Sequence, residues 1–507
     1  MSEHIGSRWR LRHRLRRLLG GSLREVAAPA ARLPAGTPAM QPSAVFELPA
    51  DHTLPRRRGV RERPDIVCLS TVDWQPDRQR PAQPMAHLAT AGHRVFFVSA
   101  APFAGGGWAY ETRHSDDNVT AVRLATAGSF DVEGGRLDDD STANLLASLA
   151  ALRRDFDLTH AMAVVYDIAS APLARRARAL FGWPLVYQCM NHREGLADRR
   201  SALPLEDAGL VHDADLLLLA DERLVATGAA ANANTALLRD SRVVATIAEG
   251  MARAFPTVSI VVVTYDNLEY TRACLRSVLE TTAYPGIEVV LVDNASRDGT
   301  GDYLRSLAAE TGVVILLNDD NRGFARAVNQ GLAAARGDRL VVLNNDTLVP
   351  DGWLPRLLRH LARPEIGLVV ATTSFAGNEA MVPIDYHDRD GLQHFADRRA
   401  VAHAGEVLDV RCAAMYCVAM RREVFTRVGP LDERFGVGMF EDDDYSQRVR
   451  AAGLRVVCAD DAFVHHFGRT AFAQLPAAEY QALWDRNLAL FEEKWGEAWQ
   501  PHRQRGQ

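Results

Sequence analysis

Two groups of acidic and amide residues have the types and spacing to hold a cation and to move a proton. The first group, Asn344-Asn345-Asp346, directly follows the apolar run Leu340–Leu343. A short β-branched run that stops at polar residues is typical of a buried parallel strand. Ligands in an open α/β sheet bind just beyond the carboxyl ends of such strands. Because a carboxylate beside amides suits a hard cation, these residues indicate a site for a cation-bound diphosphate.

The second group is Glu441-Asp442-Asp443-Asp444, which places four carboxylates in a row. Like charges this close repel one another, which raises the pKa of one carboxyl group toward a value useful for a general base. Acidic residues are also favourable in the first turn of a helix, where they interact with the helix dipole. That structural explanation applies to Asp443 and Asp444.

Polar residues follow two earlier apolar runs in the same way. Thr264-Tyr265-Asp266 ends one run and Asp293-Asn294 ends the next. Carboxylates at these strand ends can accept hydrogen bonds from a nucleobase N–H group and from ribose hydroxyls. Ser296 and Asp298 are better explained as caps of the following helix. Asp293 lies before that cap, so we expect it to bind a ligand rather than to form a turn.

A glycine stands at the start of a further expected helix, in the run Asn321-Arg322-Gly323-Phe324. Gly323 permits close approach of the backbone, and the first N–H groups of the helix are free to face an anion. A plain junction between a loop and a helix explains the same residues. Only together with the Asn344-Asn345-Asp346 strand does this stretch point to a binding site.

These residues need a sheet to position them, and the sequence predicts two. Strands and helices alternate along both halves of the chain, which favours parallel sheets in an α/β fold. In the first half we expect strands at 65–70, 93–99, 163–165, 185–187 and 214–219, with a helix at 84–91. In the second half we expect strands at 257–263, 288–292, 313–317 and 339–343, with helices at 267–280, 298–309, 324–335 and 484–499.

The second half resembles family-2 glycosyltransferases of the rhamnosyl- and galactofuranosyl-transferase kind, which have the GT-A nucleotide-diphospho-sugar transferase fold. The matching residues are Thr264-Tyr265-Asp266, Asp293-Asn294, Asn321-Arg322-Gly323-Phe324, Asn344-Asn345-Asp346, and Phe440–Tyr445 with Arg448 and Gly453. Arg411–Tyr416 is similar to the acceptor-side strand of the family. The resemblance implies a UDP- or dTDP-linked sugar donor, a divalent cation (Mg²⁺ or Mn²⁺), and inversion at the anomeric carbon.

The resemblance also implies a role for each matching residue. Asp442 is the general base, at the second position of the family's Glu-Asp-x-Asp pattern. Asp346 is the principal metal ligand, because the amide of Asn344 contributes no charge. His465 matches a histidine that completes the metal shell, although the adjacent His466 leaves the register open. Binding of the nucleotide sugar falls to Thr264, Tyr265, Asp266, Asp293, Asn294, Asn321, Gly323, Phe324, Asn344, Asn345 and Glu441.

The first half resembles the amino-terminal, Rossmann-like half of a GT-B glycosyltransferase of family 4 or family 1. Trp74–Arg80 is similar to the first loop of that fold and Tyr187–Asn191 to its Tyr-Asp-Cys-Met-Asp segment. In GT-B enzymes the donor binds mainly to the second half, which does not follow here. The resemblance therefore implies acceptor binding or a scaffolding role for this domain. We expect a basic, partly disordered arm at 1–62, the half-GT-B domain at 63–254 and the GT-A domain at 255–500.

Composition places the protein among water-soluble globular chains. It has 507 residues, a net charge of −6 and 47% hydrophobic residues. No apolar run has the length of a membrane span, and no secretory signal is expected. Its six cysteines show no metal-binding or disulfide-scaffold spacing, which favours a reducing cytosol.

The arm is basic, with 13 Arg against 5 acidic residues in 1–64. Leucines at helical spacing among arginines in 8–19 are consistent with a helix on an anionic membrane surface, or with a solvated arm. We expect a cytoplasmic protein, in the first case peripheral at the inner face of the membrane. Nothing in the sequence indicates binding to nucleic acid.

The expected function is transfer of a sugar from a nucleotide-diphosphate donor to a saccharide or polyprenyl-linked acceptor in surface glycan biosynthesis. Two alternatives stay open. One is a non-catalytic sugar-nucleotide or glycan-binding scaffold of a polysaccharide assembly complex. The other is a nucleotidyltransferase, which uses similar sheet and metal chemistry and releases pyrophosphate.

Overall fold

The computed structural model describes most of the chain after residue 52. The described residues are 53–56, 58–59, 63–70, 74, 82–99, 109–114, 119–125, 139–166, 168–189, 208–220, 222–237, 245–247, 249–250, 255–468 and 476–506. The predicted basic helix at 8–19 lies outside them, as does most of Trp74–Arg80. Among the described residues, no helix is long and apolar enough to cross a membrane.

The first sheet is parallel except at one edge. Its strands are β1 (Asp65–Ser70), β2 (Val95–Ser99), β3 (Tyr110–His114), β4 (Val119–Leu124), β5 (Ala161–Val165), β6 (Leu185–Cys189), β7 (Leu216–Leu219) and β8 (Thr235–Leu237). They lie in the order β3-β4-β2-β1-β5-β6-β7-β8, and only β3 runs antiparallel to its neighbour. The helices are α1 (Ala82–Thr90), α2 (Asp139–Asp155), α3 (Ala171–Phe181), α4 (Ala208–Asp213) and α5 (Val225–Ala231). Apolar cores cover both faces of this sheet, as the near-continuous hydrophobic strands require.

The second sheet is mixed. Its strands are β9 (Val258–Thr264), β10 (Ile287–Asp293), β11 (Val314–Leu317), β12 (Arg339–Asn344), β13 (Thr347–Leu348), β14 (Ile366–Thr373), β15 (Val407–Asp409), β16 (Cys417–Arg421) and β17 (Arg455–His466). The order is β11-β10-β9-β12-β16-β14-β17-β13, with β15 beside β17. The first four strands of that order are parallel to one another, whereas β16 is antiparallel to both of its neighbours.

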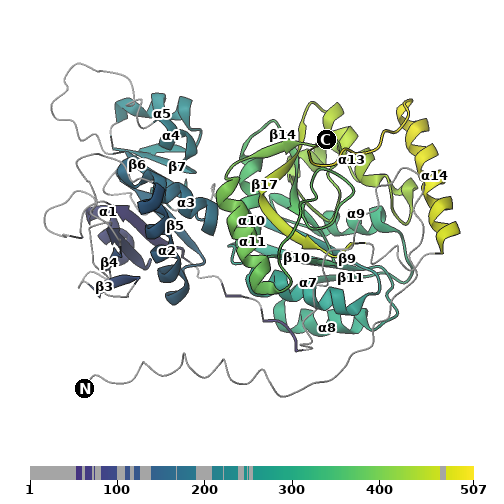
Figure 1. Ribbon diagram of the computed structural model, residues 1–507, viewed down its shortest axis with the longest axis horizontal. Helices are drawn as coiled ribbons and strands as arrows, with labels where there is room; N and C mark the ends of the chain where they lie inside the picture. Colours follow the sequence, from purple (N-terminus) through teal and green to yellow (C-terminus); the bar gives the residue numbers. More distant parts are fainter. Residues whose placement is uncertain are drawn as a thin grey trace.

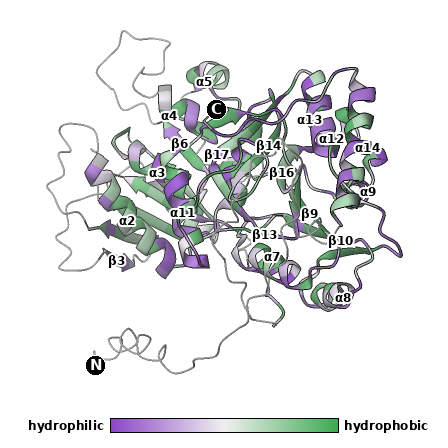
Figure 2. Cartoon of the chain, turned by 45° about the vertical axis from the view of Figure 1, so that its right-hand side comes forward, coloured by the Kyte–Doolittle hydropathy of each residue, from purple (hydrophilic) through white to green (hydrophobic). Residues whose placement is uncertain are grey.

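The helices of the second half are α7 (Leu268–Thr281), α8 (Thr300–Thr311), α9 (Phe324–Ala334), α10 (Trp353–Leu358), α11 (Arg389–Ala402), α12 (Arg422–Val428), α13 (Glu441–Ala451) and α14 (Ala477–Trp495). Figure 1 shows the two sheets side by side, with α10 and α11 toward the first sheet and α14, in yellow, at the opposite end of the molecule. In Figure 2 the central strands are hydrophobic and the outer helices carry most of the hydrophilic residues. One large core surrounds the second sheet.

The α/β class is confirmed, and the strands predicted in both halves are present with ends shifted by one or two residues. Arg411–Tyr416 is different, because these residues form an irregular segment and the strand begins only at Cys417. In the first half β3, β4 and β8 and the helices α2 to α5 were not predicted, and in the second half β13, β14, β15 and β17 and the helices α10 to α13 were not predicted. The assignment of the first sheet to a half-GT-B domain, and the domain boundaries, stay predictions.

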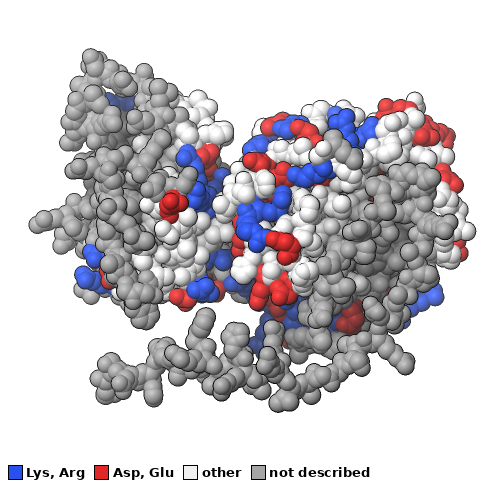
Figure 3. Space-filling model, viewed as in Figure 1, with Lys and Arg blue, Asp and Glu red and all other residues white. Residues whose placement is uncertain are grey.

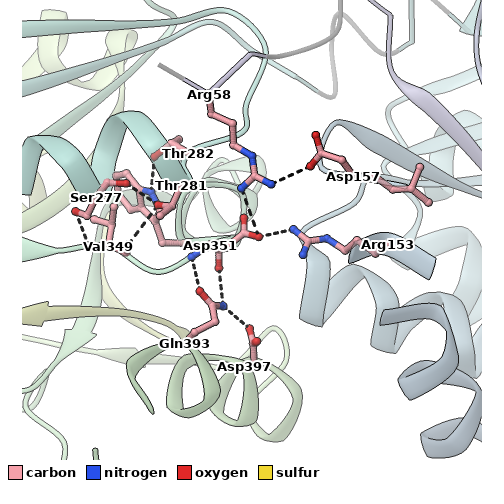
Figure 4. A network of polar contacts seen from close by, with 12 residues as sticks. Arg58, Arg153, Asp157, Ser277, Thr281, Thr282, Val349, Asp351, Gln393 and Asp397 are labelled. Atoms are coloured by element: carbon pink, nitrogen blue, oxygen red, sulfur yellow. Dashed lines mark hydrogen bonds and ion pairs between the residues drawn. The ribbon is translucent and has the colours of Figure 1, made fainter. Parts of the chain in front are cut away.

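Charged residues line the junction between the two halves, where Figure 3 shows side chains of both signs. Asp351, just before α10, lies 2.5 Å from Arg153 of α2 and 4.0 Å from Arg58. Figure 4 shows Asp351 between these arginines, while its backbone contacts Gln393 of α11. Burial opposes ionisation of Asp351, but the nearby arginines, Arg153 foremost, hold its pKa below the ordinary value.

The segment before β1 contacts helix α7 of the second half of the chain. Arg276 of α7 donates hydrogen bonds to Thr53, and the N–H group of Arg58 donates to the carbonyl of Leu279 at 2.7 Å. Phe255 packs against both cores, edge-on to His160 on one side and to Tyr284 on the other. Contacts far apart in sequence therefore join the two halves.

Candidate functional site

The carboxyl ends of β9 and β10 hold a buried polar network around Asp293. Asp293 pairs with Thr264 across the two parallel strands, and the Thr264 hydroxyl donates to Asp293 Oδ1 at 3.0 Å. Ser296 donates to the same carboxylate from its hydroxyl, at 2.5 Å, and from its N–H group, at 3.2 Å. Both Thr264 and Asp293 are buried. The network fixes the carboxylate at the strand end, where a nucleotide is expected to bind.

Asp266 lies beside this network in an unusual backbone conformation. Its φ is +49°, and Asn267 follows at +61°. The N–H group of Arg297 donates to Asp266 Oδ1 at 2.7 Å, and the N–H group of Asp266 donates to Ser296 Oγ at 2.8 Å. Left-handed residues of this kind cluster where a site imposes the geometry. The preceding Tyr265 is exposed, so its ring is accessible to a ligand.

Asp298 has the structural role expected of it. Its carboxylate accepts from the N–H group of Leu268, the first residue of α7, at 2.7 Å. It also accepts from the N–H group and the hydroxyl of Thr300, the first residue of α8. The carboxylate therefore satisfies free N–H groups at the starts of two helices.

Asn294 connects the end of β10 to the start of α9. Its Nδ2 donates to Asn321 Oδ1 at 2.7 Å, and its Oδ1 accepts from the N–H group of Arg322 at 3.0 Å. Asn321 Oδ1 in turn accepts from the N–H group of Gly323. Phe324, half-buried, then begins α9.

Gly323 is needed for conformation and for space. Its φ is +81°, and a Cβ atom placed on it would lie 2.1 Å from the carbonyl oxygen of Gly436. The loop that leads into the acidic helix α13 therefore lies directly against the start of α9. This contact places the Asn321–Phe324 segment beside the residues that precede the Glu441–Asp444 run.

Asp346 faces a histidine, but the histidine is His466. Asp346 is buried, and its Oδ1 lies 3.2 Å from His466 Nε2. The other ring nitrogen, Nδ1, lies 2.8 Å from the carbonyl oxygen of Phe375. Donation to that carbonyl leaves Nε2 without a proton in the neutral ring, which is the form that binds a metal. Burial lowers the pKa of His466, but the charge and hydrogen bond of Asp346 outweigh it and raise the pKa overall.

His465 lies on the other face of β17, as strand geometry requires for adjacent residues. Its Nδ1 lies 2.7 Å from the Tyr386 hydroxyl, and its ring packs edge-on against Phe467. Burial, with the neighbouring His466, lowers its pKa to about 4. In place of the predicted His465, the structure puts His466 next to Asp346.

The two other residues of the Asn344-Asn345-Asp346 run have separate surroundings. The Asn344 carbonyl accepts from the Thr347 hydroxyl at 2.8 Å, which closes the turn after β12. Asn345 Nδ2 donates to Thr271 of α7 at 2.9 Å. A carboxylate and an imidazole nitrogen are both ligands that Mn²⁺ accepts, so Asp346 and His466 fit a divalent cation.

The acidic run forms the first turn of α13, and its members have different environments. Asp444 and Asp443 each accept a hydrogen bond from a side chain of residues 477–506. Asp442 Oδ1 accepts from the N–H group of Asp443 at 3.0 Å. Burial and the charge of Asp443 raise the pKa of Asp442 to about 6, although His502 opposes the shift. Glu441 is buried with no partner for its Oε2, and burial raises its pKa as well.

The segment Arg411–Tyr416 joins the metal-side residues to the acidic helix. The N–H group of Ala413 donates to Ser446 Oγ of α13 at 2.9 Å. Three residues later the Tyr416 ring stacks on His466 with centroids 5.0 Å apart. This segment therefore contacts both α13 and His466.

Sequence reasoning missed several residues at this site. Tyr416 and Phe375 orient His466, and Trp499 and His502 contact Asp443. The doubled histidine was a signal, since alternation along a strand allows only one of the two to face Asp346. The contacts of Trp499 and His502 depend on the path of the chain after α14 and left no local signal.

Comparisons with known proteins concern the second half of the chain. Residues 259–429 match the model of Glycosyl transferase family 2. The O-antigen biosynthesis protein RfbC of Myxococcus xanthus is 32% identical over 248 residues, which are 45% of this chain and 19% of that protein. Glycosyltransferase AglE of Haloferax volcanii is 27% identical over 225 residues, which are 43% of this chain and 69% of that protein.

Among solved structures, the mannosyltransferase PcManGT from Pyrobaculum calidifontis in complex with GDP-Man and Mn²⁺ is 21% identical. It covers 48% of this chain and 66% of that chain, with a TM-score of 0.36. The family match and the curated relatives support a glycosyltransferase role for the second half of this chain.

Proposed function

We propose that this protein is an inverting, metal-dependent glycosyltransferase that uses a UDP- or dTDP-linked sugar donor. The observation that carries the proposal is the approach of three groups of residues. Asp293 and its network lie at the end of β10, and Asp346, which follows β12, faces His466 of β17. The loop before the acidic turn of α13 lies against Gly323, and the segment Arg411–Tyr416 contacts both α13 and His466. The family match over 259–429 supports the class of reaction.

Each group has a separate task in the proposed reaction. Asp266 and Asp293 select the nucleoside, with Thr264, Tyr265 and the Asn294–Asn321 pair shaping the site. Asp346 and His466 would hold Mg²⁺ or Mn²⁺, which neutralises charge on the departing nucleoside diphosphate. Asp442 takes the proton of the acceptor hydroxyl as the new glycosidic bond forms on the opposite face of the sugar.

A raised pKa suits Asp442 to that task. A base works best when its pKa lies close to the operating pH, because it then accepts a proton readily and is still ionised before the reaction. The value of about 6 meets both conditions near pH 7. Asp443 and Asp444 are engaged by donors of the C-terminal segment, so they are poor candidates for the same role.

The first sheet and the basic arm have proposed roles that follow from the same chemistry. We assign the first sheet to acceptor binding or to scaffolding, as a Rossmann-like half-GT-B domain. The acceptor is then a saccharide or a polyprenyl-linked saccharide of a surface glycan, and the arm at 8–19 would contact the membrane that carries it.

The test compares wild type with Asp442→Asn in a screen of nucleotide sugars with Mn²⁺. Loss of a general base is expected to lower transfer or donor hydrolysis about 10²- to 10⁴-fold. Asp140→Asn, an exposed residue of α2, is the matched control and is expected to keep full activity. Equal rates for wild type and Asp442→Asn would support the scaffold alternative, and release of pyrophosphate rather than UDP or dTDP would support a nucleotidyltransferase.

A further inference from the structure

The segment 477–506, beyond the region that matches the family, packs on the acidic end of α13. It consists of α14 and an extended tail, and α14 lies at the edge of the second sheet away from the first (Figure 1). An aromatic cluster joins the segment to the loop before α13. Its members are Phe435, Met439, Phe440, Trp484, Leu488, Leu490, Phe491, Trp495 and Trp499.

Asn487 of α14 fixes the backbone immediately before the acidic run. It is fully buried, and its Nδ2 lies 2.9 Å from the carbonyl oxygen of Phe435, 2.8 Å from that of Gly438 and 3.1 Å from that of Met439. Met439 and Phe440 both have left-handed φ values, +76° and +71°, which non-glycine residues rarely adopt. Strained backbone of this kind persists only where the surroundings impose it. Asn487 contributes three contacts to this turn, and Arg486 also donates to the Phe435 carbonyl at 3.1 Å.

The tail then engages Asp443. Trp499 Nε1 donates to Asp443 Oδ1 at 3.1 Å, and His502 Nε2 lies 3.3 Å from the same oxygen. His502 is also close enough to Asp442 for the two charges to interact. His502 therefore stands beside the proposed base while Asp443 anchors it.

Asp444 receives its partners from the same segment. Trp495 Nε1 donates to Asp444 Oδ1 at 3.1 Å, and Lys494 Nζ lies 2.6 Å from that oxygen. Arg448 of α13 donates to the other carboxylate oxygen at 3.0 Å. Two of the three aspartates are thus neutralised by donors, which leaves Asp442 to act on a substrate.

The far end of the tail reaches the metal-side residues. Gln504 and Arg505 donate to the carbonyls of Gly377 and Glu379, and Arg505 also pairs with Asp460 at 2.6 Å. Gly377 and Glu379 belong to the loop whose Phe375 carbonyl orients His466. The tail therefore spans from the acidic turn to the loop beside the Asp346–His466 pair.

We propose that residues 477–506 position the general base, with Asn487 holding the turn before Asp442 and His502 setting the electrostatic environment of Asp442. Both are positioning residues, and the proposal rests on the proposed function. The charged and titratable groups near His502 are Asp442 and Asp443 of α13 and Glu379 of the loop after β14, while Glu441, Asp443 and Cys412 lie near Asp442.

The first experiment measures kcat/KM against pH for wild type, His502→Gln and Asp443→Asn. Removing the cation beside Asp442 raises its pKa, so the acidic limb of the profile in His502→Gln is expected to move up by about 0.5 to 1 pH unit. Removing the like charge of Asp443 lowers the pKa of Asp442, so the limb in Asp443→Asn is expected to move down. His502→Arg keeps a cation and is expected to restore the wild-type limb.

The matched control is His403→Gln, which breaks a histidine–carboxylate pair with Glu406 at the end of α11. Its profile is expected to equal that of wild type. An unchanged limb in both His502→Gln and Asp443→Asn would overturn the electrostatic part of the proposal. If His502→Gln does not fold, Asp443→Asn decides the question by the presence or absence of its downward shift.

The second experiment compares Asn487→Asp with Gln481→Glu, the same change of amide to carboxylate at a half-buried residue of α14 that does not contact the turn before α13. Asn487→Asp removes the shared donor, and kcat is expected to fall at least about 10-fold with donor KM changed less than about 3-fold. Gln481→Glu is expected to change neither. Asn487→Ser, which keeps one donor, replaces Asn487→Asp if that variant fails to fold.

Unchanged kcat in a folded Asn487 variant, or equal losses in kcat and donor affinity, would overturn the positioning role. Different outcomes would contradict the proposed function. If wild type transfers no sugar, or if Asp442→Asn is as active as wild type, the assignment of the base is wrong. An active wild type with an inactive Asp442→Asn and unaffected His502 and Asn487 variants refutes only the present inference.

Discussion

Adjacent histidines on β17 provide a matched pair of variants for the proposed metal site. His466→Asn removes the nitrogen 3.2 Å from Asp346, whereas His465→Asn removes a partner of Tyr386. We expect His466→Asn to raise the Mn²⁺ concentration for half-maximal activity at least about 10-fold. His465→Asn is expected to lower the melting temperature and to leave the Mn²⁺ dependence unchanged. A larger effect of His465→Asn on the Mn²⁺ titration would return the ligand assignment to His465.

The pKa of Asp442 also predicts how stability depends on pH. The folded-state value of about 6 lies above the ordinary value of 3.8, so the folded state binds the proton more tightly than the unfolded chain. Ionisation therefore costs stability, with no cost below about pH 4 and the full cost above about pH 6. Asp442→Asn removes this cost. Its gain in melting temperature over wild type, without added metal, is expected to be larger at pH 7.5 than at pH 4.

The same comparison for Asp140→Asn is the control, with no pH-dependent gain expected from an exposed side chain. An equal gain for Asp442→Asn at both pH values would show that Asp442 titrates normally. A loss of stability in Asp442→Asn would be equally contrary to the prediction, since a buried carboxylate with a raised pKa costs stability when it is ionised.

At the scale of elements, Gly323 joins α9 to the loop before α13. Gly323→Ala places a methyl group against the Gly436 carbonyl in a left-handed backbone, whereas Gly312→Ala has a similar φ of +69° with open space around it. We expect Gly312→Ala to cost about 1 kcal/mol. Gly323→Ala is expected to cost roughly 3 kcal/mol in chemical denaturation, because overpacking adds to the same backbone strain. Equal costs would mean that the two segments separate easily.

The sequence predicted five of the eight strands described in the first sheet and four of the nine described in the second. Apolar runs such as 258–263 and 340–343 reveal strands because they have the length of buried strands and end at polar residues. The sequence also predicted which residues cluster, since carboxyl ends of neighbouring parallel strands meet. It did not predict the side chains that orient them. Tyr416 and Asn487 act through contacts across long stretches of chain, and no local spacing reveals such contacts. Arg411–Tyr416 was mistaken for a strand because its apolar residues pack inward from an irregular segment.

At the scale of the whole molecule, Arg356 of α10 is a buried connection between the two halves. It is 1% exposed, and its guanidinium donates to the carbonyls of Ala179 and Leu180 in the last turn of α3 and to Asp397. Arg356→Leu leaves those groups without their donor and is expected to cost about 3 kcal/mol. Calorimetry is expected to show the first half unfolding separately, ahead of the second.

Arg398→Leu serves as the control for this variant, because its ion pair with Asp385 is exposed on α11. Such a pair contributes less than about 1 kcal/mol, so a single transition close to that of wild type is expected. A single, unshifted transition for Arg356→Leu would mean that the remaining contacts, with Asp351 among them, are enough to couple the halves.

Phe255 has a practical consequence for any attempt to produce the catalytic half alone. Its ring packs against His160 and Tyr284 at once, so a truncation near this residue uncovers apolar surface on whichever fragment is made. A fragment that lacks the residues before Phe255 also lacks Leu54, which packs against the core of the second sheet, and Thr53, which accepts a hydrogen bond from Arg276. Shortened versions starting at residue 256 are therefore expected to precipitate during purification, and intact chain is the better starting material for crystallisation and assays.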